Sequence, residues 1–165
     1  MEIRKITKNK KAYLPLLLLG DEQEDMIDRY LARGEMYLLT DGGAKAVCVV
    51  TDEGGGLLEL KNIAVTPYAQ RQGYGRQLLD FIEKTYCNNF SVLQAGTGDS
   101  PQTTLFYEAC GFVRSHVIEH FFTMHYDHPI FEGGKQLTDM VYFQKKLSKR
   151  TGLQLPENFS IIKGK

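Results

Sequence analysis

Residues 62–76, NIAVTPYAQRQGYGR, join an apolar run to a loop that contains two glycines. The run ends at Pro67, and a helical pattern begins at Gly75, where apolar residues start to recur three and four positions apart. Glycine lets backbone amides approach a ligand closely, and the start of a helix offers unpaired N–H groups with a partial positive charge. The loop over residues 70–76 is therefore a candidate binding site for a phosphate group.

Two other glycine-rich phosphate loops do not fit this stretch. The dinucleotide-binding pattern GxGxxG would need a third glycine where Leu78 stands, and the Walker pattern would need Gly-Lys-Ser/Thr after the loop. A tight turn into the helix would also explain Gly73 and Gly75 without any ligand. Arg71 and Arg76 lie on either side of the glycines and add positive charge. By itself the loop indicates an anion site and leaves the tight turn as an alternative.

The patterns on either side of the loop predict an α/β domain over residues 1–147, followed by a C-terminal tail over 148–165. Two strands, 57–65 and 90–95, are linked by one helix and should be parallel, whereas hairpin turns make other neighbours antiparallel. Asp21 is expected to cap the second helix. The predicted strands are Glu2–Thr7, Met36–Thr40, Ala44–Thr51, Leu57–Val65, Phe90–Ala95, Phe112–His125 and Leu137–Leu147, and the predicted helices are Leu14–Leu19, Glu22–Arg33, Gly75–Tyr86 and Pro101–Cys110.

Composition narrows the class of protein. The 20 basic and 20 acidic side chains give no net charge, which argues against a nucleic-acid binder. Three scattered cysteines indicate no disulfide framework, and the apolar run Leu14–Leu19 is too short for a signal peptide or a membrane span. His116 and His120 would lie about 13 Å apart on a strand, too far to share one metal ion. We therefore expect a cytoplasmic protein with no metal and no membrane partner.

The loop and its flanks resemble a known family. Gln70-Arg71-Gln72-Gly73-Tyr74-Gly75 is similar to the Q/R-x-x-G-x-G/A signature of the Gcn5-related N-acetyltransferase (GNAT) superfamily. Residues 62–65 resemble the fourth strand of that family, and residues 105–112, LFYEACGF, resemble its LYxxxGF ending. The resemblance spans residues 1–147 and implies the GNAT fold, a mixed, mostly antiparallel twisted sheet of about seven strands, splayed between the parallel strands 57–65 and 90–95 and flanked by about four helices.

The resemblance implies acetyl-CoA as the cosubstrate and an N-acetyltransferase that acts on a primary amine of a small molecule or peptide, by direct attack in a ternary complex. A non-catalytic acyl-CoA-binding sensor or scaffold is the alternative. Ser100 stands where many relatives have an asparagine that contacts the cofactor, although it also suits the cap of a helix. The resemblance assigns the coenzyme A pyrophosphate to the loop and the pantetheine arm to the strand before it, through Gln70, Arg71, Gln72, Gly73, Tyr74, Gly75 and Arg76, and through Ile63, Ala64 and Val65.

Two residues are candidates for proton transfer. Tyr107 matches the tyrosine that commonly protonates the departing thiolate in this family, and it lies about 200° around the helix from Leu105 and Ala109, so it need not share their apolar stripe. Glu59 lies at the position of a catalytic glutamate in some members and is the candidate general base. By strand alternation it shares a face with Lys61, Ile63 and Val65. A simple ion pair with Lys61 would also explain an acid in an apolar strand.

The acceptor site of this family usually lies among the first helices and the last strands. Here that implies residues 21–33 and 126–136, whose mixed charges select no particular amine. The segment 121–131 is rich in aromatic residues, for which core packing or a homodimer interface is a plainer explanation than substrate contact.

Overall fold

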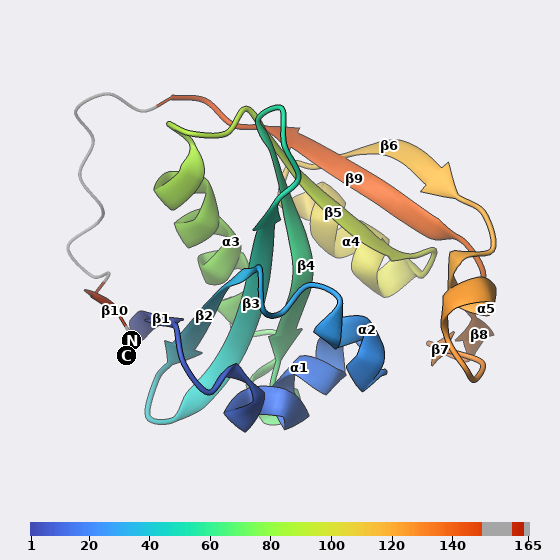
Figure 1. Cartoon of the computed structure of the whole chain (residues 1–165), viewed down its shortest axis with the longest axis horizontal. Coiled ribbons are helices and arrows are strands. Elements are labelled where there is room, and N and C mark those ends of the chain that lie inside the picture. Colours follow the sequence, from blue (N-terminus) through green and yellow to red (C-terminus); the bar gives the residue numbers. More distant parts are fainter. Residues whose placement is uncertain (150–159, 164–165) are drawn as a thin grey trace.

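The structure is a computed structural model, and it describes residues 1–149 and 160–163. Figure 1 shows a twisted sheet with helices on both faces. The strands are β1 (Glu2–Ile6), β2 (Glu35–Thr40), β3 (Ala44–Asp52), β4 (Leu57–Val65), β5 (Val92–Gly98), β6 (Val113–Ile118), β7 (Phe131–Glu132), β8 (Lys135–Gln136), β9 (Met140–Lys146) and β10 (Ser160–Lys163). The helices are α1 (Leu14–Gly20), α2 (Glu24–Asp28), α3 (Tyr74–Tyr86), α4 (Pro101–Ala109) and α5 (Phe121–His125), with 3-10 turns at Lys10–Tyr13 and Pro67–Ala69.

The main sheet has the strand order β10-β1-β2-β3-β4-β5-β9-β6, and β7 and β8 form a separate hairpin. Strands β4 and β5 are parallel, as predicted, and their other neighbours in the sheet are antiparallel. Strand β10 pairs in parallel with β1 and extends the seven-stranded sheet at that edge. It belongs to the predicted tail 148–165, of which residues 150–159 and 164–165 lie outside the described residues.

Two apolar layers hold the helices against the sheet. Helices α3 and α4 cover one face, where the buried side of α3, including Phe81 and Ile82, packs against Leu60 and Phe143 of the strands. Helices α1 and α2 cover the opposite face near β4 and β3 (Figure 1), with Leu17 at the centre of a second cluster. The apolar period of α3 explains its position, because a helix with one apolar stripe must bury that stripe.

Three predicted elements were too long. The predicted strand Phe112–His125 ends at Ile118, because His120 adopts a left-handed backbone with φ 59° and donates its N–H to the Asp139 carboxylate, after which α5 begins. The predicted strand Leu137–Leu147 begins only at Met140, as β9.

The predicted helix Glu22–Arg33 is reduced to the five residues of α2 and the turns that follow it. Asp21 does not cap it, since the N-cap is Gln23. The Asp21 carboxylate instead accepts hydrogen bonds from the hydroxyls of Tyr30 and Tyr126. Tertiary hydrogen bonds therefore replace the local cap that the sequence pattern predicts.

A β-bulge in β4 reverses the side-chain alternation along that strand. Val49 of β3 lies opposite Asn62, and the next residue, Val50, lies opposite Leu60, so Lys61 is the extra residue. As a result Leu60 and Ile63 both join the apolar layer beneath α3. The prediction that Glu59 shares a face with Ile63 and Val65 was therefore wrong, because uninterrupted alternation does not hold across a bulge.

Candidate active site

The strands β4 and β5 separate at the middle of the sheet. Their pairing ends at Leu60 opposite Ala95. Beyond that point β4 continues only along β3, as far as Val65, and β5 continues only along β9, as far as Gly98. The facing backbone groups of residues 61–65 and 96–98 therefore do not pair with each other. Such groups need hydrogen-bond partners, so an extended ligand with amides of its own can complete this opening.

The glycine loop lies at the end of β4 and leads into α3. Gly73 is the N-cap of α3 with φ 85°, and no side chain caps the helix. A Cβ at Gly73 would meet no atom within 4 Å, so this glycine serves the left-handed conformation and faces open space. A Cβ at Gly75 would lie 3.4 Å from Phe106 and 3.7 Å from Val65, which are ordinary contact distances, so this position has room for a Cβ but not for a larger side chain. The two glycines thus have different physical roles.

The other loop residues leave the start of the helix accessible. The Gln70 amide donates to the Val65 carbonyl at 3.3 Å, and the Gln72 amide donates to the Tyr68 carbonyl at 3.3 Å. Tyr74 donates its hydroxyl to the Asp41 carboxylate at 2.7 Å and so ties the loop to the turn between β2 and β3. The remaining side chains, Arg71 and Arg76, are exposed. An anion at the α3 N-terminus would meet free backbone N–H groups and these two cations.

Tyr107 lies on the buried face of α4. Its ring stacks on Phe143 with 5.7 Å between ring centroids and meets Phe112 edge-on at 5.4 Å. Burial raises the pKa of Tyr107 well above its ordinary value, so the phenol stays protonated. Leu105 and Ala109 are exposed, the former at 65%, so the buried stripe is the one that contains Tyr107 rather than theirs. The sequence correctly placed Tyr107 on a different face of the helix from Leu105 and Ala109. The face of Leu105 and Ala109, which the apolar pattern suggested as the buried one, is the exposed face.

Ser100 begins α4 and has a buried hydroxyl without a partner. The residue is 1% exposed, and its carbonyl accepts the N–H of Thr104 at 3.0 Å. Its Oγ makes no capping hydrogen bond and no other hydrogen bond to the described residues. The expected side-chain cap is therefore absent here, and the hydroxyl is available to a ligand. An unpartnered buried hydroxyl costs stability unless something binds it.

Glu59 is buried and has partners on both carboxylate oxygens. Lys61 Nζ lies 2.5 Å from Oε2, and the Gln94 amide donates to Oε1 at 2.6 Å. Gln94 in turn accepts a hydrogen bond from Gln144 of β9 at 2.8 Å. The ion pair that the sequence left open is present, and it accounts for a carboxylate in the middle of the sheet.

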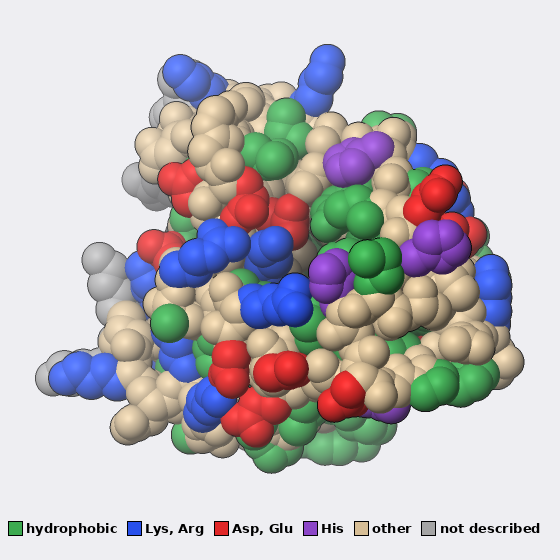
Figure 2. All heavy atoms as spheres, turned by 45° about the vertical axis from the view of Figure 1, so that its right-hand side comes forward, with side chains coloured by type: hydrophobic (Ala, Val, Ile, Leu, Met, Phe, Trp, Pro, Cys, Tyr) green, Lys and Arg blue, Asp and Glu red, His purple; other side chains and the backbone are tan. Residues whose placement is uncertain are grey.

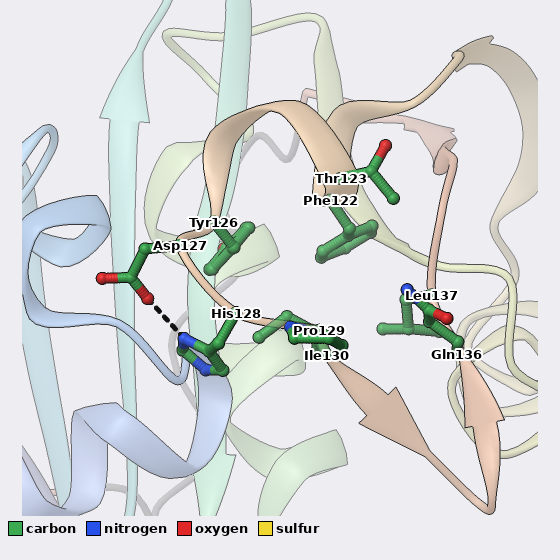
Figure 3. Close-up of a pocket in the computed structure, with 9 residues that line it drawn as sticks. All are labelled: Phe122, Thr123, Tyr126, Asp127, His128, Pro129, Ile130, Gln136 and Leu137. Atoms are coloured by element: carbon green, nitrogen blue, oxygen red, sulfur yellow. Dashed lines mark hydrogen bonds and ion pairs between the residues drawn. The ribbon is translucent and has the colours of Figure 1, made fainter.

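The segment from α5 to β8 forms a wall beside α1 and α2. Phe122, Ile130 and Leu137 make a small apolar cluster, and Tyr126 joins this segment to the rest of the molecule by donating to Asp21 at 2.6 Å. Figure 3 shows the side chains around a cavity of about 230 Å³ in this segment. Met124 and Phe131, in contrast, are exposed. Sequence reasoning missed both α5 and the cavity.

The histidines do not form a metal centre. His116 stacks on Tyr142 with 4.6 Å between ring centroids, and histidine side chains lie apart from one another on the face shown in Figure 2. Within residues 1–149 and 160–163, no three His, Cys, Asp or Glu side chains are close enough to hold a metal ion. The helices of the same ranges are too short or too polar to cross a membrane.

Comparison with known proteins supplies context for this geometry. A model of the acetyltransferase (GNAT) domain matches residues 32–114. The protein named uncharacterized N-acetyltransferase YvbK, from Bacillus subtilis (strain 168), is 44% identical over 130 residues, which cover 76% of this chain and 83% of that protein. A GNAT family acetyltransferase from Elizabethkingia anophelis with acetyl-CoA bound is 34% identical with a TM-score of 0.82, covering 88% of this chain and 97% of the other. An IAA acetyltransferase from Bacillus cereus ATCC 14579 is 33% identical with a TM-score of 0.80, covering 88% and 98%.

Proposed function

This chain belongs to the GNAT family of acetyltransferases and is an acetyl-CoA-dependent N-acetyltransferase. We propose that it transfers the acetyl group directly to a primary amine of a small molecule or peptide. The observation that carries this proposal is the separation of β4 from β5 beyond Leu60 and Ala95, beside the uncapped N-terminus of α3. An extended arm and an anionic group can bind there together. This is the shape of coenzyme A at its pantetheine and pyrophosphate ends.

The pyrophosphate site is assigned to the loop residues Gln70, Arg71, Gln72, Gly73, Tyr74, Gly75 and Arg76. Free N–H groups at the start of α3 and the exposed Arg71 and Arg76 support this assignment. The pantetheine arm is assigned to Ile63, Ala64 and Val65, whose backbone lies along the free edge of β4. The Elizabethkingia structure with acetyl-CoA bound supports the assignment by its similarity of fold.

Ser100 is assigned to the cofactor as well. Its buried Oγ lacks a partner within the described chain and lies at the start of α4, next to the end of β5. A carbonyl or amide of the bound arm would satisfy it. This assignment predicts a gain of one hydrogen bond on binding.

The chemistry then needs a base for the ammonium and an acid for the departing thiolate. The amine nitrogen, once deprotonated, attacks the thioester carbonyl carbon, the C–S bond breaks, and the thiolate of coenzyme A takes a proton from Tyr107. The nitrogen loses its second proton as the amide forms, and that proton restores the phenol of Tyr107. The raised pKa of Tyr107 keeps that proton in place until the thiolate forms. Glu59, directly or through a chain of water molecules, receives the proton that the ammonium loses. Lys61 and Gln94 fix the position of its two oxygens, and each oxygen keeps a second lone pair that can accept a proton.

Three expectations from the sequence stay predictions. These are the boundary of the catalytic domain at residue 147, a location in the cytoplasm and a homodimer. The expectation that no metal is required also stays a prediction.

The test is amine-dependent release of the coenzyme A thiol from acetyl-CoA. The purified protein would be assayed with polyamines, amino acids, aminoglycosides and peptides, and with no amine as the reference. We expect release above the reference with at least one amine class and a matching acetylated product by mass spectrometry. Acetyl-CoA binding without turnover on any amine would instead support the sensor or scaffold function.

A further inference from the structure

Two tyrosines, Tyr107 and Tyr142, lie on opposite sides of the sheet near the opening between β4 and β5. Tyr107 belongs to the apolar layer that α3 and α4 cover. Tyr142 stands in β9 between Val141 and Phe143, which both belong to that layer, so its own side chain points to the other face. Of the two phenols, only Tyr107 takes part in the proton transfers proposed for this site.

The ring of Tyr142 lies over Gly96, at the edge of this opening. Gly96 is opposite Tyr142 in the pairing of β5 with β9, and it directly follows Ala95, where the pairing of β5 with β4 ends. A Cβ at Gly96 would lie 2.9 Å from Cε1 and 3.1 Å from Cζ of Tyr142, so the ring fills the space that a side chain would need. Because Cζ carries the hydroxyl, the hydroxyl lies over the point where β5 loses its contact with β4.

Packing fixes the phenol of Tyr142 but leaves its hydroxyl without a partner. His116 of β6 stacks on the ring with 4.6 Å between centroids and 4° between the planes. The residue is 8% exposed, and its hydroxyl forms no hydrogen bond with residues 1–149 or 160–163. A buried hydroxyl without a partner costs stability, so packing alone does not explain why this ring carries one. The hydroxyl is therefore held in place and free to bind a substrate.

Glu59, the candidate base, lies on the same face of the sheet as Tyr142. The Gln144 amide donates to Gln94 at 2.8 Å, and the Gln94 amide donates to Glu59 at 2.6 Å, so these side chains form a row across β9, β5 and β4. Tyr142 and Gly96 each lie two residues from the members of this row on their own strands, a step of about 7 Å along the sheet. A carboxylate and a phenol thus border the opening from the same side.

The charged side chains near this row pair with one another. Lys61 lies 2.5 Å from Glu59 and 3.9 Å from Glu53, and Glu53 binds Arg33 at 2.8 Å. Burial, and then the charges of Glu59 and Glu53, raise the pKa of Tyr142 to about 12, so the phenol is neutral at pH 7. A neutral phenol donates one hydrogen bond and accepts others at its oxygen. Tyr142 therefore offers a substrate a hydrogen bond rather than a charge.

The free edge of β4 and the hydroxyl of Tyr142 suit different atoms of the reaction. Backbone N–H groups of residues 61–65 that lack a partner on β5 can donate to the thioester carbonyl oxygen. The hydroxyl lies above the sheet instead, and Leu137 of the wall packs on the same face at Gly98, two residues beyond Gly96. An amine bound beside the wall can therefore bring its nitrogen to this hydroxyl.

We propose that the hydroxyl oxygen of Tyr142 accepts a hydrogen bond from the amine nitrogen while that nitrogen attacks the thioester carbonyl carbon. This rests on the proposed function and adds a catalytic residue to it. The attacking nitrogen of a primary amine carries two N–H groups, of which one supplies the proton that restores Tyr107 and the other faces Tyr142. The nitrogen becomes positively charged as its bond to carbon forms, which makes its N–H a stronger donor. The hydrogen bond is therefore stronger in the transition state than in the bound substrate, and it acts on kcat.

Tyr142→Phe removes the hydroxyl and keeps the ring that stacks on His116. With acetyl-CoA and the amine that the wild type acetylates fastest, we expect kcat to fall by about tenfold or more, the ratio for one hydrogen bond to a charged group. The KM for the amine and the Kd for coenzyme A should stay within about twofold. Tyr13→Phe is the matched control and should keep the wild-type kcat, because its hydroxyl binds Arg4 of β1, three strands from β4.

Stability separates catalysis from packing in this variant. Thermal unfolding of Tyr142→Phe should match that of wild type or occur slightly higher, because the hydroxyl has no partner to lose within the described part of the chain. An unchanged kcat in the folded variant, with turnover by the wild type, would overturn the role of Tyr142 and leave the transferase function standing. No turnover by the wild type with any amine would overturn both.

Gly96→Ala moves the same hydroxyl without removing it. The added Cβ would lie 2.9 Å from the ring of Tyr142, so the ring must shift. We expect Gly96→Ala to lower kcat in the wild-type background and to lower it little further in Tyr142→Phe, where the hydroxyl is already absent. Calorimetric titration with coenzyme A should give a similar Kd for all four proteins. Losses in kcat that multiply fully in the double variant would contradict the proposal, because Gly96→Ala would then act through another group.

Discussion

The Nζ of Lys61 lies 2.5 Å from Oε2 of Glu59, and Lys61 is the residue that the β-bulge places outside the regular pairing of β4. Lys61 also lies 3.9 Å from Glu53, which binds Arg33 at 2.8 Å. The carboxylate of Glu59 is thus buried at the point where β4 and β5 are about to separate, and a network of charges and amides compensates it.

Lys61→Met should destabilise the protein, because it leaves Glu59 buried with only Gln94 as a partner. The expected loss is about 1–3 kcal/mol in the free energy of unfolding, measured by urea denaturation at pH 7. The double variant Lys61→Met with Glu59→Gln is the control and should recover most of the loss. No difference between Lys61→Met and wild type would show that the ion pair contributes nothing to stability.

Ser100→Ala separates a capping role from a binding role. A side-chain cap would make the change cost about 1 kcal/mol of stability. Because Ser100 Oγ makes no hydrogen bond within the described chain, we expect unchanged or slightly raised stability and weaker coenzyme A binding, by about fivefold for one lost hydrogen bond. Thermal unfolding of the free protein and calorimetric titration with coenzyme A give the two values. A destabilised free protein with unchanged affinity would favour the cap.

Gly75→Leu tests the limited space between the start of α3 and its neighbours Phe106 and Val65. The added side chain would have to displace Phe106 and Val65, so we expect a loss of about 1–3 kcal/mol in unfolding free energy. Gly75→Ala is the matched control, since its single Cβ would make only ordinary contacts at 3.4 Å and 3.7 Å. Equal stability of the two variants would mean that the helix can move away at little cost.

Cys48 makes stability depend on pH under alkaline conditions. Burial raises the pKa of this thiol from 9.0 to about 12. Between these values the unfolded chain loses the proton and the folded chain retains it, so the unfolded state binds fewer protons and stability falls as pH rises. Urea denaturation should therefore show lower stability at pH 10.5 than at pH 8.5, with a smaller decrease in Cys48→Ala. An equal decrease in both proteins would assign the effect to other groups.

The loop and the parallel strands could be predicted because their signals are local. An apolar run, two glycines and a helical period lie within residues 57–86, and each acts on the backbone near it. The bulge at Lys61 could not be predicted in this way, because it arises from the register between β3 and β4. That register depends on side-chain packing across the whole sheet.

The acceptor side of the site was less predictable for a related reason. Residues 121–125 have aromatic and branched side chains typical of strands, but their packing with Ile130 and Leu137 stabilises a helix instead.

The most direct test of the central claim compares wild type with Tyr107→Phe in steady-state acetyl transfer and in coenzyme A binding. The claim that Tyr107 protonates the thiolate predicts a fall in kcat of about 10²-fold or more, the range of general acid catalysis, with the Kd for coenzyme A unchanged within about twofold. The variant keeps the ring that stacks on Phe143, so its thermal unfolding should match that of wild type within a few degrees. Full activity in a folded Tyr107→Phe protein would contradict the account.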